Sequence, residues 1–160
     1  MYKYLLVFLV SMVPLVELRL AIPFSHVMEL PALPSYIVAV IGNMLPVPVI
    51  YFFARKVLEW GADKPYIGKF FTWCLEKGHR GGEALRKKAG RRGLFVALML
   101  FVGIPLPGTG AWTGTLAASF LDMGFKSSVL AVMLGVVLAG IIMWAASAGL
   151  LGALSFLFAV

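Results

Sequence analysis

Two opposite charges, Glu17 and Arg19, lie inside one of the most apolar stretches of the chain, "PLVELRLAIP", which runs from Pro14 to Pro23. An ionised side chain at the centre of a bilayer costs about 2.5–3.5 kcal/mol on insertion scales, so charges there are functional candidates. A guanidinium binds phosphate or carboxylate groups, and a carboxylate can hold a proton or a cation. Arg19 is therefore a candidate substrate ligand, and Glu17 a candidate for coupling to a proton or sodium ion.

Spacing limits how these two side chains can act together. In a helix, residues two positions apart point roughly 200° away from each other, whereas in an extended segment they point to the same side. We therefore expect Glu17–Pro23 to be a non-helical break at the tip of a hairpin. At membrane depth, such backbone must be buried in protein or face water. The alternative is a structural ion pair in an ordinary interface loop.

A second apolar stretch is broken by "GIPLPGTG", from Gly103 to Gly110. Its prolines prevent a regular helix, and its glycines allow a tight turn and close approach to a ligand. If the two tips meet, they form one small site suited to a phosphate-like headgroup. The predicted substrate-binding residues there are Arg19, Gly108, Thr109 and Gly110. The predicted tip prolines are Pro14, Pro23, Pro105 and Pro107. The alternative is a plain kink in one long helix, residues 93–121.

Three more polar residues lie within or beside the apolar blocks. Asp122 is a second ion-coupling candidate, although it can equally flank a membrane end near Lys126. Arg55 can contact lipid phosphate, although a snorkelling anchor explains it more simply. Asn43 is expected to form an interhelical hydrogen bond rather than to bind a ligand.

The composition describes an integral membrane protein, with 61% hydrophobic residues, 13% charged residues and a mean hydropathy of +0.96. The 160 residues are too few for a large transporter unless subunits pair. The single cysteine, Cys74, excludes an internal disulfide and a cysteine metal cluster, and no cofactor is expected. The N-terminus loosely imitates a signal peptide, but we expect it to be retained because it lacks a small-residue cleavage site. No Walker, dinucleotide, GxSxG or HExxH motif occurs, so we expect no enzyme.

Positive charge is concentrated in one connecting segment, because 11 of the 14 lysines and arginines fall between Arg55 and Arg92. The positive-inside rule places this segment in the cytoplasm. Anionic lipid explains the bias better than nucleic acid does, because the segment is tethered between membrane blocks. Its apolar residues at helical spacing predict an amphipathic helix on the inner leaflet. These residues are Ile67, Phe70, Phe71 and Cys74.

The blocks predict a single all-α membrane domain, 1–160, in two similar halves. The expected segments are a re-entrant hairpin (1–34), a transmembrane helix (35–58), a basic amphipathic linker (59–92), a second re-entrant hairpin (93–124), a transmembrane helix (125–148) and an apolar tail (149–160). A hairpin plus one crossing per half makes the halves an inverted repeat, which is typical of transporters. "AVIG" (Ala39–Gly42) weakly matches "AVMLG" (Ala131–Gly135). The small residues Ala131, Gly135 and Ala139 favour close helix contact and a homodimer.

Three motifs carry a family resemblance: "PLVELRLAIP", "GNMLPVP" (Gly42–Pro48) and "GIPLPGTGAWTGTLAA" (Gly103–Ala118). They resemble the small multidrug export protein family, which looks like a compact relative of the DedA superfamily of VTT-domain membrane proteins. The resemblance implies two re-entrant hairpins in inverted repeat. It also implies ion-driven transport of polyprenyl phosphate across the cytoplasmic membrane. The chain departs from the DedA pattern because its second hairpin carries no arginine.

Three hypotheses for function follow from these features. The first is a DedA-like flippase for a phosphate-bearing lipid, with Arg19 and the second tip binding phosphate. The second is a proton-coupled small multidrug exporter of lipophilic cations, lined by Phe101, Trp112 and Trp144, which the charge of Arg19 disfavours. The third is a non-transporting membrane assembly factor, which a closed apolar interface between the tips would favour.

Overall fold

The computed structural model describes residues 2–64, 68–106 and 108–158, and every element in these ranges is an α-helix. The helices are α1 (Tyr2–Met12), α2 (Glu17–Val27), α3 (Ala32–Met44), α4 (Pro46–Ala62), α5 (Gly68–Gly103), α6 (Ala111–Phe120) and α7 (Phe125–Phe158). The all-helical prediction is confirmed.

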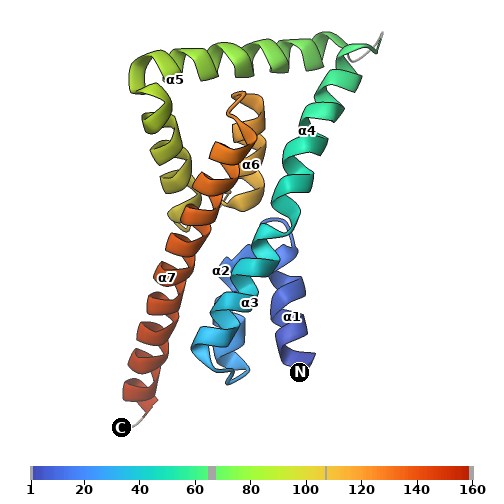
Figure 1. Cartoon of the computed structure of the whole chain (residues 1–160). Helices are drawn as coiled ribbons and strands as arrows, with labels where there is room; N and C mark the ends of the chain where they lie inside the picture. The colour runs from blue at the N-terminus through green and yellow to red at the C-terminus, as the bar shows by residue number, and fades with distance from the viewer. Residues whose placement is uncertain (1, 65–67, 107, 159–160) are drawn as a thin grey trace.

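The chain forms two short helical hairpins, each followed by a long helical stretch (Figure 1). In the first half, α1 rises from the N-terminus to mid-height, α2 returns, and α3 with α4 runs the full height of the molecule. In the second half, the last part of α5 descends to mid-height, α6 returns, and α7 runs from below the arm of α5 down to the opposite end. The tips of the two short hairpins therefore lie at about the same level, in the middle of the molecule.

Two helical stretches are long and apolar enough to cross a membrane. They are Ala32–Ala62 and Phe125–Gly149. Both extend past the predicted spans of 35–58 and 125–148, and the expected apolar tail continues α7 as helix to Phe158. Only a turn before Pro46 interrupts the first stretch. Pro46 is the first residue of α4, and the fixed φ of proline suits that position of a helix.

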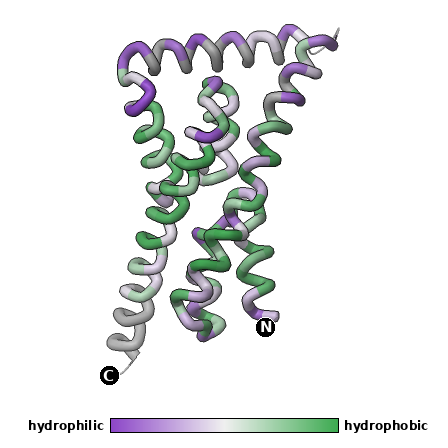
Figure 2. The backbone as a smooth tube through the Cα atoms, in the orientation of Figure 1, coloured by the Kyte–Doolittle hydropathy of each residue, from purple (hydrophilic) through white to green (hydrophobic). Residues whose placement is uncertain are grey.

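Helix α5 combines the basic segment with the start of the second hairpin. It bends at Gly90, whose φ of 67° and ψ of 179° suit only glycine. The arm before Gly90 lies across one end of the molecule and is rich in hydrophilic residues (Figure 2). Of the predicted apolar stripe on this arm, Ile67 lies outside the described residues, as do the side chains of Phe70, Phe71 and Cys74.

Small residues let α7 approach α5 closely. Ala131, Gly135 and Ala139 are all buried within the protomer. A Cβ at Gly135 would lie 2.6 Å from the backbone oxygen of Met99. These three residues, which we expected to form a homodimer contact, are therefore buried by helix packing within one chain. The prediction that they form the dimer contact is wrong. A dimer through another face stays a prediction.

Candidate functional site

The first break lies earlier in the chain than the sequence suggested. The chain leaves the helix at residues 13–16 and re-enters it at Glu17, with Leu15 and Glu17 at positive φ values of 68° and 50°. Pro23 lies inside α2, so the prediction that residues 17–23 are non-helical is wrong. Proline has a helical φ and removes one backbone hydrogen bond, a loss that α2 offsets by burying Leu18 and Ile22.

Glu17 joins the two hairpins through its carboxylate. Its Oε2 accepts a hydrogen bond from the backbone N–H of Ala111 at 3.2 Å, and its Oε1 accepts one from Trp112 at 3.1 Å. These are the first two residues of α6, whose N–H groups have no partner within the helix. Only 3% of Glu17 is exposed. The carboxylate thus occupies a buried helix N-terminus, where backbone donors and the helix dipole favour an anion.

Arg19 contacts the same hairpin from the first turn of α2. Its Nη2 donates to Thr109 Oγ1 at 2.7 Å and to the backbone oxygen of Ile104 at 3.3 Å. Its Nη1 lies 3.9 Å from Glu17 Oε2, and its buried Nε has no hydrogen-bond partner among the described residues. The two charges form a weak ion pair, but each is held mainly by the second tip. Glu17 and Arg19 do share one site, although Arg19 is helical.

The second tip is shaped to receive the carboxylate. Gly110 has a φ of 153° and a ψ of −174°, and a Cβ placed on it would overlap Glu17 Oε2 and lie 2.7 Å from Glu17 Cδ. Gly108 has a φ of 82°, but a Cβ there would meet nothing within 4 Å. Trp112 adds a third link, because its Nε1 donates to the backbone oxygen of Met12 at 3.2 Å.

These contacts define a latch, which consists of Glu17, Arg19, Thr109, Gly110 and the first two residues of α6. The alternative of one long helix over residues 93–121 is excluded, because α5 ends at Gly103 and α6 returns antiparallel to it (Figure 1). The interface between the tips is polar, so it differs from the closed apolar interface expected of an assembly factor.

The other predicted site residues lie elsewhere or are not described. Asp122 follows the opposite end of α6 from the latch, about 15 Å along a ten-residue helix. It lines a cavity of about 290 Å³ together with Arg91 and Ser127. Arg55 lies on α4, and its side chain is outside the described part of the structure. Pro105 belongs to the second tip, Pro14 to the first, and Pro107 lies outside the described residues.

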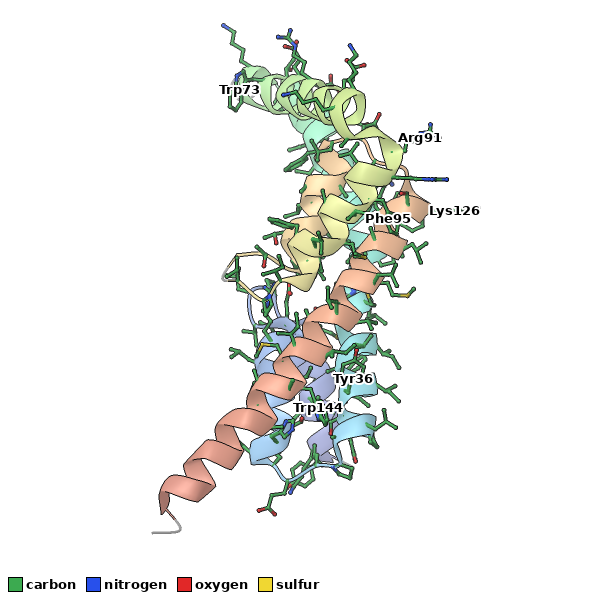
Figure 3. The ribbon with its side chains drawn as sticks, turned by 90° about the vertical axis from the view of Figure 1, so that its left-hand side faces the viewer. Tyr36, Trp73, Arg91, Phe95, Lys126 and Trp144 are labelled. Atoms are coloured by element: carbon green, nitrogen blue, oxygen red, sulfur yellow. The ribbon has the colours of Figure 1, made fainter. Side chains whose placement is uncertain are left out.

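The aromatic residues expected to line a drug site do not line a common cavity among those described. Trp112 contacts the first tip, and Phe101 lines an apolar cavity of about 210 Å³ beside α6. Trp144 lines another apolar cavity of about 240 Å³, with Tyr36 and Ile141. Figure 3 shows Tyr36 and Trp144 close together on neighbouring helices, well away from Phe95 and Arg91.

Sequence reasoning missed two features of this region. The partners of Glu17 are backbone N–H groups, which carry no residue-type signal. Asn43 was expected to bond another helix, yet it is fully buried and neither end of its amide has a partner among the described residues. The sequence could have indicated the first feature, because Gly110 precedes the apolar helix that begins at Ala111 and is a favoured N-cap residue.

Two apolar helices of spanning length, in a chain whose described elements are all helices, indicate a membrane protein. Its residues 17–142 match the family described as "Putative small multi-drug export protein", and the chain belongs to that family. The family description is that of an exporter and not of an enzyme. No curated protein matches the chain significantly, and neither does any solved structure.

Proposed function

We propose that the protein is a membrane transporter built as an inverted repeat of a re-entrant hairpin and a spanning helix. Matched positions 93 residues apart support the repeat. Ser35 and Ser128 are both buried, and each donates to the carbonyl four residues earlier, at 2.8 and 3.0 Å. Gly42 and Gly135 each closely approach a backbone oxygen of the helix that begins their half, α1 or α5. A repeat predicts that such details recur at one fixed spacing, as they do here.

The membrane orientation follows from the charges. The arm of α5 before Gly90 is rich in hydrophilic residues and lies across one end of the molecule (Figure 2). By the positive-inside rule this end faces the cytoplasm, and the protein lies in the cytoplasmic membrane. The latch then lies near the midplane, where the inverted repeats of transporters place their substrate and ion sites.

The substrate proposed for this site is a phosphate-bearing lipid, such as polyprenyl phosphate, in keeping with the resemblance to DedA proteins. One observation carries the proposal: a buried helix N-terminus and Arg19 already hold an anion, which is the carboxylate of Glu17. A phosphate headgroup makes the same kinds of contact with backbone N–H groups and a guanidinium. Glu17 therefore occupies the position that the headgroup requires.

We also propose how proton binding at Glu17 drives transport. A protonated Glu17 has lost the charge that holds it at the α6 N-terminus, so the two N–H groups become available to the headgroup. When the headgroup leaves, the deprotonated carboxylate returns and closes the latch. Proton binding and headgroup binding are then linked, because both depend on the release of one side chain.

Transport of a fluorescent phosphate-bearing lipid in proteoliposomes tests this function. We expect Arg19→Gln to reduce transport at least about tenfold, because one charge-assisted contact contributes about 1.5–3 kcal/mol. We expect Glu17→Gln to bind the headgroup but to lose the dependence of transport on a proton gradient. Leu20→Ala, on the exposed side of α2, is the matched control. Unchanged transport in both Arg19→Gln and Glu17→Gln would rule out the assignment.

A second candidate is an exporter of lipophilic cations, with Glu17 as the proton-exchange residue. The family description and the apolar cavity beside Tyr36 and Trp144 favour it, because aromatic faces attract organic cations. Efflux of a cationic dye from cells decides between the two. Dye efflux that is lost in Trp144→Ala but retained in Arg19→Gln would support this candidate over lipid transport.

A further inference from the structure

We propose that the protein binds a sodium ion at the junction of α3 and α4, through the side-chain oxygen of Asn43 and neighbouring backbone carbonyls. The site is separate from the latch, and sodium binding can be measured whatever the transported substrate is. If the proposed transport function holds, sodium bound here is a candidate coupling ion.

Asn43 is the first observation. It is 0% exposed, and both Oδ1 and Nδ2 lack a hydrogen-bond partner among the described residues. Leaving one such buried group unpaired costs about 1–3 kcal/mol. Val136, the matched position in the second half, is 1% exposed and apolar. A hydrocarbon side chain therefore packs well at the matched position. Packing does not explain why the first half has a buried, unpaired amide there.

The sequence after Asn43 supplies more oxygen atoms. In a helix, the carbonyl of Gly42 would accept from the N–H of residue 46, and the carbonyl of Met44 from that of residue 48. Both of those residues are prolines and have no N–H. The two prolines thus release two backbone carbonyls on either side of the unpaired amide.

Helix α1 approaches the same place. A Cβ at Gly42 would overlap Ser11 Oγ and lie 2.7 Å from the backbone oxygen of Phe8. Ser11 is fully buried and donates its hydroxyl hydrogen to Phe8 O at 2.7 Å, so its oxygen beside Gly42 can act only as an acceptor for another group. Ser11 Oγ and the two carbonyls freed by the prolines therefore add oxygen acceptors near the Asn43 amide.

This set of neutral oxygens fits a hard monovalent cation. Amide and carbonyl oxygens suit such cations, and broken helices in transporters coordinate sodium through released carbonyls. Imidazole and thiolate clusters suit transition metals, and carboxylate clusters suit divalent cations such as calcium. No group of three or more such residues that could hold a metal ion occurs in the part of the chain that the structure describes. A phosphate is disfavoured, because acceptors would face its oxygens.

Sodium-dependent thermal stability of the purified protein tests the site, with choline chloride and potassium chloride at equal ionic strength as references. A ligand that binds only the folded state at ten times its Kd raises the folded-to-unfolded ratio about tenfold. We expect a saturable rise in Tm with sodium only. Asn43→Leu should abolish this rise, and Asn43→Asp should retain it because it keeps the oxygen ligand. Val136→Ala, the matched control, should lower Tm but keep the sodium-dependent rise.

Binding of radiolabelled sodium to the wild-type protein is the second measurement, and it does not depend on how any variant folds. We expect about one ion per chain, displaced by unlabelled sodium and not by potassium. Pro46→Ala, which restores an N–H for the Gly42 carbonyl, should weaken binding. Equal Tm values in sodium and choline, no bound label, or a sodium-dependent rise that persists in Asn43→Leu would each overturn the proposal. A loss of lipid transport with sodium binding intact would instead count against the transport function alone.

Discussion

Replacing Gly110 by alanine should open the latch, because the added methyl group would occupy the place of the Glu17 carboxylate. Gly108→Ala is a matched control on the same tip. Both glycines have backbone angles that L residues avoid, with φ values of 153° and 82°. Only the Cβ at Gly110 meets Glu17, whereas the Cβ at Gly108 meets nothing within 4 Å. The difference between the two variants therefore isolates the latch from backbone strain.

The magnitude follows from the contacts. A single alanine forced into a left-handed conformation costs about 1–2 kcal/mol, and we expect this value for Gly108→Ala. Gly110→Ala should cost a similar strain and also displace the carboxylate from the N–H groups of Ala111 and Trp112. One lost charge-assisted hydrogen bond contributes about 1.5–3 kcal/mol. We therefore expect Gly110→Ala to be less stable than Gly108→Ala by about 1.5–3 kcal/mol, or roughly 10- to 150-fold in the unfolding equilibrium.

The assay is reversible unfolding in mixed micelles with increasing denaturing detergent, followed by circular dichroism and by tryptophan fluorescence. The double variant Gly110→Ala/Glu17→Ala provides a further check. Once the carboxylate is absent, the methyl group has nothing to displace, so the additional cost of Gly110→Ala should disappear in that background. Equal stability of Gly108→Ala and Gly110→Ala, or an additional cost that persists without Glu17, would refute the role given to the carboxylate.

Three further predictions concern other contacts, each measured by the same unfolding assay. Thr109→Val should cost about 1–3 kcal/mol, because it removes the oxygen that accepts from Arg19, whereas Thr109→Ser should stay within about 0.5 kcal/mol of wild type. Tyr51→Phe should cost about 1–3 kcal/mol, because the buried hydroxyl donates to the backbone oxygen of Met123 and ties α4 to the end of α6; no loss of stability would contradict that link. Gly90→Ala should cost about 1–2 kcal/mol from its positive φ alone, and Gly124→Ala, with open space around its Cβ and no positive φ, should be near neutral.

Some of the site could be predicted from residue types because charge in an apolar segment demands a partner. Glu17 and Arg19 could be placed near the second tip for that reason, and "GIPLPGTG" could be recognised as a break. The exact position of the first break could not be predicted. Prolines at both ends of the segment, Pro14 and Pro23, are equally strong sequence signals, and only tertiary packing makes Pro23 part of a helix.

The backbone partners of Glu17 could not be predicted from the sequence either. The Glu17 carboxylate is held by two N–H groups, and every residue except proline carries such a group. Their availability depends on where α6 begins, and helix boundaries are the least reliable part of a sequence-based prediction. The dimer prediction from the small-residue stripe on α7 was wrong for a related reason. The stripe correctly indicated a close helix contact, but residue types do not show which helix makes it.

Departures from the proposed repeat identify where the two halves have different tasks. Glu17 and Gly110 occupy matched positions, 93 residues apart, and they contact each other. In a pair of halves related by a pseudo-two-fold axis, matched residues that touch lie near that axis, so two large side chains would collide there. One half therefore supplies a carboxylate and the other supplies empty space and two N–H donors. Asn43 and Val136 differ in the same way, since a polar amide in one half matches a hydrocarbon in the other. Packing near the axis explains why Gly110 is small, but it explains neither the charge of Glu17 nor the amide of Asn43. An anion position and a cation position would account for both.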